Sequence, residues 1–254
     1  MFATTLVVSA RWRRRASGPH RLACVVICAE QVARGVEGVR RRIASAGGDP
    51  DVVRLVAVTK GFGPDAVAAA IAAGVDHVGE SYTSELVAKA VASPPDVRWH
   101  FIGRLQSNKV KAVAPLVELW QSVDRPSLVR HIGERAPGAQ VLVQVNASGE
   151  ATKGGCHPDD AAGLVADAGR AGLRVGGLMA IGPEGEPERA RPAFRLLREL
   201  ADGLGLAERS MGMSDDLEVA VQEGSTMVRV GRALFGARGS MPGADTGTVV
   251  RRCH

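Results

Sequence analysis

Eight short apolar segments alternate with helix-like segments along most of the chain, and this alternation restricts the possible folds more than any other feature of the sequence. It is typical of a parallel sheet, because parallel strands need a crossover connection that is usually a helix. Strands rich in branched residues and apolar on both faces favour a closed (β/α)8 barrel over an open doubly wound sheet, which is the alternative. The strands are expected at 53–59, 75–80, 97–103, 117–123, 139–146, 173–181, 209–212 and 226–230.

The helices are predicted from their start and stop residues. A first helix over 30–46 precedes the strands and ends where Gly47 and Gly48 follow. Ser214 is expected to cap a late helix whose first turn holds Asp215 and Asp216. The fold class is therefore α/β, a single TIM-type barrel with an additional N-terminal helix. The remaining helices are expected at 65–73, 82–92, 107–114, 126–135, 158–170 and 187–203.

Residues 1–29 lie outside this pattern. They contain five arginines and no acidic residue, so they carry the whole formal charge of +5. The rest of the chain balances 27 basic against 27 acidic side chains, which gives no argument for nucleic-acid binding. We predict a basic N-terminal extension over 1–29 that is disordered or absent from the mature protein, a barrel over 30–240 and a C-terminal tail over 241–254.

The cysteines argue against a metal site and against disulfides. Cys24, Cys28, Cys156 and Cys253 are scattered and do not form a pair of zinc-ligand motifs. Nothing in their spacing indicates a disulfide framework, so a reducing cytoplasm is the expected location. No apolar run approaches the roughly 20 residues of a transmembrane helix, and no membrane partner is expected.

The segment LVAVTKGFG, residues 55–63, ends an apolar strand on a lysine. Alternation along a strand directs Val56, Val58 and Lys60 to the same face. Lysine is rarely buried unless a partner offsets the loss of hydration. Lys60 is therefore either the first solvated loop residue or an amine in apolar surroundings, which is a nucleophile for an aldehyde.

The carboxyl ends of barrel strands meet at one rim, where active sites of such barrels lie. Lys60 ends the first strand, and Arg229 lies near the end of the eighth, which neighbours the first in a closed barrel. Gly231 follows Arg229 and precedes an apparent helix start, an arrangement that directs free N–H groups at an anion, and Ser210 adds a hydroxyl from strand seven. A lysine beside an anion site fits an aldehyde that carries a phosphate, and pyridoxal 5′-phosphate (PLP) is the obvious candidate.

Several long motifs connect the chain to a known family. They are LVAVTK, VGESY, WHFIGRLQSNK, SVDR, VNASGEATKGG, GLMAIGP and MGMSDDLEVAVQEGSTMVRVGRALFG. Over residues 30–238 the chain resembles the pyridoxal phosphate homeostasis proteins, small single-domain relatives of the alanine racemase barrel. The resemblance implies that Lys60 carries PLP as an internal aldimine and that Arg229 faces the pyridine nitrogen. It also implies that the phosphate lies against Ser210 and the backbone at Gly231 and Arg232.

Two positions depart from the family pattern, and three more are further candidates. Ser81 stands where the family has asparagine, and Arg232 stands where a small hydroxyl residue is common. Met179 ends the sixth strand at the same rim. His100 is either a core histidine of the third strand or a site residue. Lys153 is either a surface lysine or the counterpart of an arginine that racemase relatives place near the phenolic oxygen of the cofactor.

Three functional classes remain open: a PLP carrier, an amino-acid racemase and a lysine-dependent aldolase. The resemblance implies a carrier that acts in PLP homeostasis, with PLP and PLP-dependent apo-enzymes as its partners. A racemase needs an acid/base group on each face of the substrate, and the chain has one tyrosine, Tyr82. An aldolase needs a carboxylate near the lysine, and Glu80 is the one found at a strand end. We therefore assign no catalytic residue and expect no robust turnover. The protein is expected to be a monomer or a weak dimer.

Overall fold

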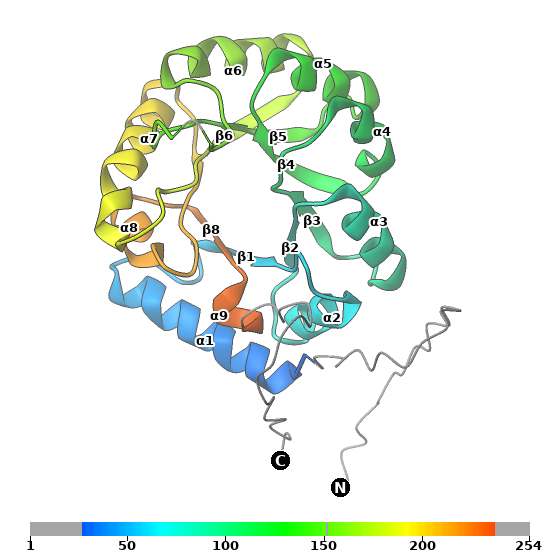
Figure 1. Cartoon of the computed structure of the whole chain (residues 1–254), viewed down its shortest axis with the longest axis vertical. Helices are drawn as coiled ribbons and strands as arrows, with labels where there is room; N and C mark the ends of the chain where they lie inside the picture. Colours follow the sequence, from blue (N-terminus) through cyan, green and yellow to red (C-terminus); the bar gives the residue numbers. More distant parts are fainter. Residues whose placement is uncertain (1–26, 151, 237–254) are drawn as a thin grey trace, which may run out of the picture.

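The computed structural model describes residues 27–150 and 152–236. Within them, eight parallel strands pair in sequence order and close into a barrel through the pairing of β8 with β1 (Figure 1). This confirms the predicted (β/α)8 barrel. The strands are β1 Arg54–Val58, β2 His77–Glu80, β3 Arg98–Phe101, β4 Val117–Val123, β5 Gln140–Gln144, β6 Arg174–Met179, β7 Glu208–Ser210 and β8 Met227–Val230.

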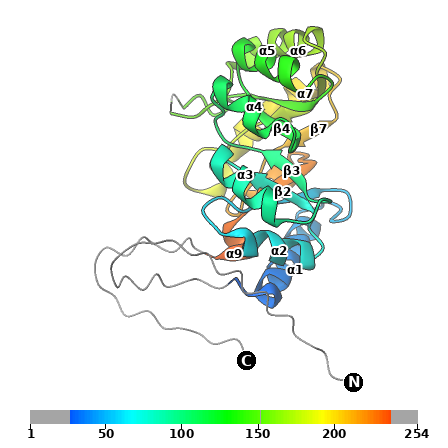
Figure 2. The ribbon, with the colours of Figure 1, turned by 90° about the vertical axis from the view of Figure 1, so that its right-hand side faces the viewer.

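The helices form an outer ring around the strands (Figure 1). In the perpendicular view of Figure 2, α1, α2 and α9 lie at one end of the molecule, and α5 and α6 lie at the other. The helices are α1 Ala29–Ser45, α2 Pro64–Ala72, α3 Thr83–Ala92, α4 Val110–Val113, α5 Pro126–Arg135, α6 Ala161–Arg170, α7 Arg191–Gly203, α8 Leu217–Gln222 and α9 Arg232–Phe235.

Helix α1, the additional N-terminal helix, buries one apolar stripe. Val32, Val36, Val39 and Ile43 recur at helical spacing and are all buried. This stripe packs in one apolar cluster with residues of α2, α8, α9 and the outer faces of β1 and β8. The helix therefore covers the seam where the last strand meets the first.

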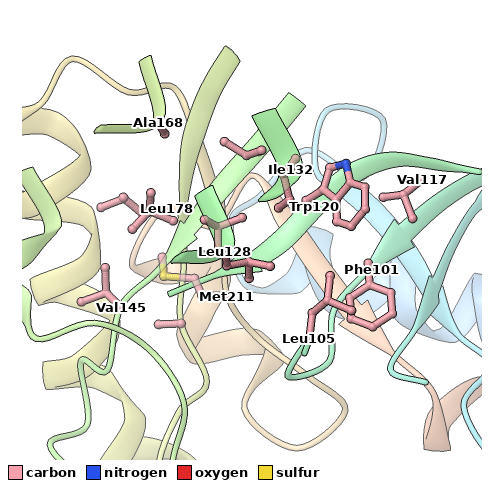
Figure 3. Packing of buried hydrophobic residues seen from close by; sticks show 14 of the residues in the cluster. Phe101, Leu105, Val117, Trp120, Leu128, Ile132, Val145, Ala168, Leu178 and Met211 are labelled. Atoms are coloured by element: carbon pink, nitrogen blue, oxygen red, sulfur yellow. The ribbon is translucent and has the colours of Figure 1, made fainter. Parts of the chain in front are cut away.

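The outer faces of the other strands pack against α3 to α7 in a second, larger cluster. Figure 3 shows part of it, including Phe101 and Trp120, whose ring centroids are 6.4 Å apart. A third, small cluster fills the inside of the barrel. Its buried members come from five strands and are Val56, Leu119, Leu142, Met179 and Met227.

The register of β1 against β8 determines what meets at the rim. Val56 lies opposite Arg229, and Ala57 lies opposite Val230. Val56 faces the barrel interior, whereas Ala57 and Val230 belong to the outer cluster, so Arg229 also faces inward. Since β1 and β8 run in parallel, their carboxyl ends bring Lys60 and Arg229 to the same rim.

Some predicted element boundaries need correction. The expected helices over 107–114, 158–170 and 187–203 each begin with a short 3-10 turn, Ser107–Lys109, Pro158–Asp160 and Pro187–Ala190. The expectation that Ser214 caps a helix with two aspartates in its first turn is wrong. Helix α8 begins at Leu217, and Asp216 Oδ1 instead accepts a hydrogen bond from Met213 N at 2.6 Å in the preceding turn.

The expected extension over 1–29 and tail over 241–254 fall almost wholly outside the described residues, although α1 already begins at Ala29. Within the described part of the chain, no helix is both long enough and apolar enough to cross a bilayer.

Candidate functional site

A cavity of about 450 Å³ opens at the carboxyl ends of the strands. Five of the predicted site residues line it, namely Lys60, Ser81, Arg229, Gly231 and Arg232. Apolar side chains from β1 and from the loops after β1, β3 and β6 form its walls, and a volume in this range suits a small organic molecule. These wall residues are Val58, Phe62, Ile102 and Ile181.

Lys60 combines the two alternatives that the sequence left open. Strand β1 ends at Val58, Thr59 is fully buried, and Lys60 begins the following turn. Lys60 is half-buried and lines the cavity beside Val58. It is thus a loop residue, as one alternative had it, but its side chain lies in a partly apolar cavity.

A partly buried ion pair on α3 holds the backbone on both sides of Lys60. Lys89 Nζ donates to the carbonyl oxygen of Thr59 at 2.7 Å, and Gly61 N donates to Glu85 Oε2 at 2.8 Å. Lys89 also pairs with Glu85 at 3.0 Å. The lysine and glutamate lie four residues apart on the helix, a spacing that places them on one face. We refer to Lys89 and Glu85 as the α3 clamp.

Glu80 belongs to the same network and lies behind the cavity wall. Its carboxylate is fully buried, pairs with Lys89, and accepts a hydrogen bond from Thr59 Oγ1 at 2.7 Å. Burial raises the pKa of Glu80 above its ordinary value, and the hydrogen bond from Lys89 opposes this rise. Glu80 does not line the cavity, so it is not the carboxylate that an aldolase would need beside Lys60.

Arg229 brings a buried positive charge to the floor of the cavity. Its guanidinium donates to Ser210 Oγ at 2.6 Å and to the carbonyl oxygen of Ala180 at 2.8 Å. Burial lowers the pKa of Arg229 to about 10, which still leaves it positively charged at neutral pH. The negative charge of Asp216 opposes this lowering of the Arg229 pKa.

Two serines of this region lie in surroundings that differ from those expected. Ser210, predicted as a phosphate contact, is fully buried below the cavity, where it accepts from Arg229 and donates to Gln121 Oε1 at 2.7 Å. Ser214, predicted as a helix cap, lines the cavity. Its hydroxyl accepts a hydrogen bond from Ala233 N at 3.3 Å.

Gly231 and Arg232 line the cavity where β8 ends beside β1. A Cβ atom on Gly231 would lie 3.0 Å from the carbonyl oxygen of Val58, so the glycine permits close approach of β8 to the end of β1. The exposed Arg232 pairs with Asp215 at 2.9 Å. With Lys60 and Arg229, the cavity lining holds three cations and one carboxylate, which favours an anionic ligand.

Three other predicted candidates are not among the residues that line the cavity. His100 is buried inside the barrel between His77 and Gln121, as the core alternative had it. Met179 fills the barrel interior. Lys153 is neither a cavity residue nor a freely solvated one, because its Nζ pairs with Glu150 at 3.0 Å and donates to the carbonyl oxygen of Gly182.

Two features of the site escaped the sequence interpretation. Ser214 lies in the quoted MGMSDD motif, but its side-chain direction depends on where β7 ends. The α3 clamp has a sequence signal, the four-residue spacing of Glu85 and Lys89, but its contact with Thr59 and Gly61 depends on the barrel. No cluster of metal-ligating side chains occurs among residues 27–150 and 152–236.

Comparison with known proteins identifies the family of the chain. The family model of the alanine racemase N-terminal domain matches residues 27–239. A pyridoxal phosphate homeostasis protein of Pseudomonas aeruginosa is 44% identical over 220 residues, which cover 83% of this chain and 95% of the relative. The chain belongs to the pyridoxal phosphate homeostasis protein family.

Solved structures place this homeostasis-family chain in the same fold. The structure of PipY from Synechococcus elongatus with PLP bound has a TM-score of 0.65 and 32% identity, and the match covers 78% of this chain and all of PipY. An alanine racemase of Clostridium difficile, at 16% identity and a TM-score of 0.62, shares the fold over 84% of this chain and 59% of its own length.

Proposed function

We propose that this chain binds PLP covalently at Lys60 and acts in PLP homeostasis, holding and delivering the cofactor without robust catalytic turnover. The observation that carries the proposal is the convergence of Lys60 and Arg229 on one cavity in a chain 44% identical to a pyridoxal phosphate homeostasis protein. The PLP-bound structure of PipY, a chain 32% identical, supports the same cofactor.

The residues of the cavity fit the three chemical parts of PLP. When bound, PLP supplies an aldehyde that condenses with a primary amine and releases water. Lys60 provides the amine, and the α3 clamp fixes the backbone from which that amine extends. The apolar walls accommodate a flat ring and exclude water.

Arg229 is assigned to the pyridine nitrogen. A guanidinium has donors only and stays charged at neutral pH, so it cannot take a proton from the ring nitrogen or give the nitrogen a negative partner. A positive neighbour disfavours protonation of that nitrogen. The ring would therefore remain in its less electron-withdrawing form, which suits a carrier better than a catalyst.

The phosphate is assigned to Ser214, Gly231 and Arg232. Ser214, Gly231 and Arg232 all line the cavity, and Ser214 Oγ accepts from Ala233 N, next to Arg232, whose guanidinium adds a positive charge. Ser210, which the family resemblance suggested for this role, is better suited to holding Arg229, since its hydroxyl is already engaged by Arg229 and Gln121.

A racemase of the alanine racemase type is the second candidate, favoured by the shared fold. It would need an acid/base group opposite Lys60. Tyr82 is 56% exposed and does not line the cavity. Asp215 does line it, but it pairs with Arg232.

Turnover separates the two functions. Purified protein loaded with PLP should absorb near the border of the visible range, lose that band in Lys60→Ala, and transfer PLP to an apo-enzyme. A panel of L- and D-amino acids, followed by chiral chromatography, should give no sustained conversion. Turnover at about 1 s⁻¹ or faster, within the ordinary enzyme range, would replace the carrier assignment with the racemase one.

Delivery to PLP-dependent apo-enzymes and a monomeric or weakly dimeric state belong to the same proposal, and so do the domain boundaries. The barrel pattern and α1 account for residues from 29 onward, which supports an extension that is dispensable for folding. Deleting residues 1–26 should leave PLP binding unchanged. The truncated protein should sediment as a monomer or weak dimer of the barrel. Loss of folded protein would show that the extension packs on the barrel.

A further inference from the structure

A row of polar side chains crosses the barrel interior beneath the cavity. His77 Nδ1 lies 2.8 Å from His100 Nε2, and His100 Nδ1 lies 2.6 Å from Gln121 Nε2. Ser210 Oγ donates to Gln121 Oε1 at 2.7 Å, and Arg229 donates to Ser210 Oγ at 2.6 Å. Four hydrogen bonds thus connect His77, the first residue of β2, with Arg229 in the cavity. We call His77, His100, Gln121 and Ser210 the barrel chain.

The direction of every bond in the barrel chain follows from Arg229. A guanidinium cannot accept a hydrogen bond, so Ser210 Oγ accepts from it and gives its single proton to Gln121 Oε1. This fixes the amide of Gln121, whose Nε2 then donates to His100 Nδ1. A neutral imidazole has one donor and one acceptor nitrogen, so His100 carries its proton on Nε2 and donates to His77 Nδ1.

The surroundings keep both histidines neutral, as this direction requires. Burial lowers the pKa of His100 well below its ordinary value and that of His77 to about 4. His77 then carries its own proton on Nε2, which lies 3.9 Å from Asp76 Oδ1. His100, Gln121 and Ser210 are almost completely buried, so water does not compete for these bonds.

Arg229 depends on the barrel chain for its position because it forms no ion pair with a carboxylate in the described part of the protein. Within the described ranges, no acidic oxygen lies within ion-pair distance of its guanidinium, and its hydrogen bonds go to Ser210 Oγ and the Ala180 carbonyl. A serine hydroxyl can rotate, so it is a defined acceptor only if its proton has a fixed partner. Gln121 supplies that partner, and His100 fixes Gln121 in turn.

We propose that the barrel chain positions Arg229: His77, His100, Gln121 and Ser210 form one oriented row of hydrogen bonds that holds the guanidinium against the cofactor ring. The last link, contact with the ring, rests on the proposed function. The direction of the chain is a property of the protein alone and can be tested without PLP.

The first test measures the histidine tautomers of the PLP-free protein by ¹⁵N nuclear magnetic resonance at pH 7. His77 and His100 should both be neutral with the proton on Nε2. In Gln121→Glu, a carboxylate can only accept, so Nδ1 of His100 should gain a proton. A parent His100 that carries its proton on Nδ1 would overturn the proposal.

The second test compares PLP binding by Gln121→Leu and by Leu142→Met, a volume-conserving change inside the same barrel but outside the chain. Gln121→Leu should shift the absorption band of bound PLP and weaken PLP retention about tenfold, because the acceptor for Arg229 loses its orientation. Leu142→Met should match the parent in both measurements.

Parent-like absorbance and affinity in Gln121→Leu would contradict the positioning role. Ser210→Ala provides the same test should Gln121→Leu not fold, as judged by circular dichroism. Failure of the parent protein to bind PLP would instead refute the proposed function and would leave the tautomer result standing.

Discussion

A methionine in place of Lys89 is expected to lower the free energy of unfolding by about 3–5 kcal/mol, the usual result of removing one partner from a buried ion pair. Lys89 is 3% exposed and Glu80 is fully buried, so neither charge can turn to water when the other is removed. The substitution also removes the donor that Thr59 O accepts at 2.7 Å. The effect is therefore expected at the upper end of what single substitutions do.

The loss of stability in Lys89→Met should depend on pH through Glu80. Burial already raises the pKa of Glu80, and without Lys89 that pKa should rise further. The folded variant would then hold a proton that the unfolded chain, with a glutamate pKa of about 4.3, has released. The destabilisation should thus be smallest near pH 4 and grow as the pH rises through the folded pKa of Glu80.

Urea unfolding of four proteins tests this reasoning: the parent, Lys89→Met, the double variant Lys89→Met/Glu80→Gln, and Lys111→Met as an exposed-lysine control. The double variant should recover most of the stability, because no fully buried charge remains unpaired: Glu85 also loses Lys89, but its side chain is 31% exposed and still accepts from Gly61 N. The control should lie within about 0.5 kcal/mol of the parent. PLP retention should fall in both Lys89 variants, since the clamp on Thr59 is lost. A loss below about 1 kcal/mol in Lys89→Met, at every pH, would refute the account of the pair.

Three other changes test separate parts of the site. Ser214→Ala should weaken PLP binding about tenfold in equilibrium dialysis, the effect of losing one hydrogen bond to a charged group, and unchanged affinity would move the phosphate elsewhere. Gly231→Val should destabilise by about 1–3 kcal/mol in thermal unfolding, because a Cβ there would lie 3.0 Å from the Val58 carbonyl oxygen, and a parent-like midpoint would contradict the close contact. Stability should fall as the pH drops from 6.5 to 4, since the unfolded chain protonates His77 and His100, which the folded barrel keeps neutral. The share of His77 is up to about 3 kcal/mol, so His77→Asn should make this slope shallower without abolishing it.

The barrel and the position of Lys60 and Arg229 at one rim could be predicted because they depend on the order of elements. Eight strands alternating with helices fix which strands are neighbours once the sheet closes, and β1 then meets β8. Side-chain periodicity along each strand does the rest. Arg229 lies within β8 and Lys60 lies two residues after β1, so predicting their positions needs almost no knowledge of loop conformation.

The surroundings of Ser210 and Ser214 could not be predicted because they depend on where a strand ends. Strand β7 continues through Ser210, which keeps that side chain inside the barrel, and the following turn brings Ser214 to the cavity. The cap assigned to Ser214 failed for the same reason, since the turn is stabilised by Asp216 instead. Neither turn conformation has a period that a sequence can reveal.

His100 and Lys89 show a second limit, which is partner choice across strands and helices. A histidine on an apolar strand is compatible with a core or a site, and only the register of β2, β3 and β4 brings His77 and Gln121 to its two nitrogens. Lys89 reads as a helix-surface residue in an ordinary four-residue ion pair. Its burial follows from the contact of α3 with Thr59 and Glu80.

The most direct test of the central claim is to load the protein with PLP, reduce it with borohydride, digest it and locate the pyridoxyl group by mass spectrometry. The account predicts one group per chain, on the peptide that contains Lys60, and none in Lys60→Ala. Modification of Lys153 or another lysine in place of Lys60, or a reduced protein with no pyridoxyl group, would contradict it.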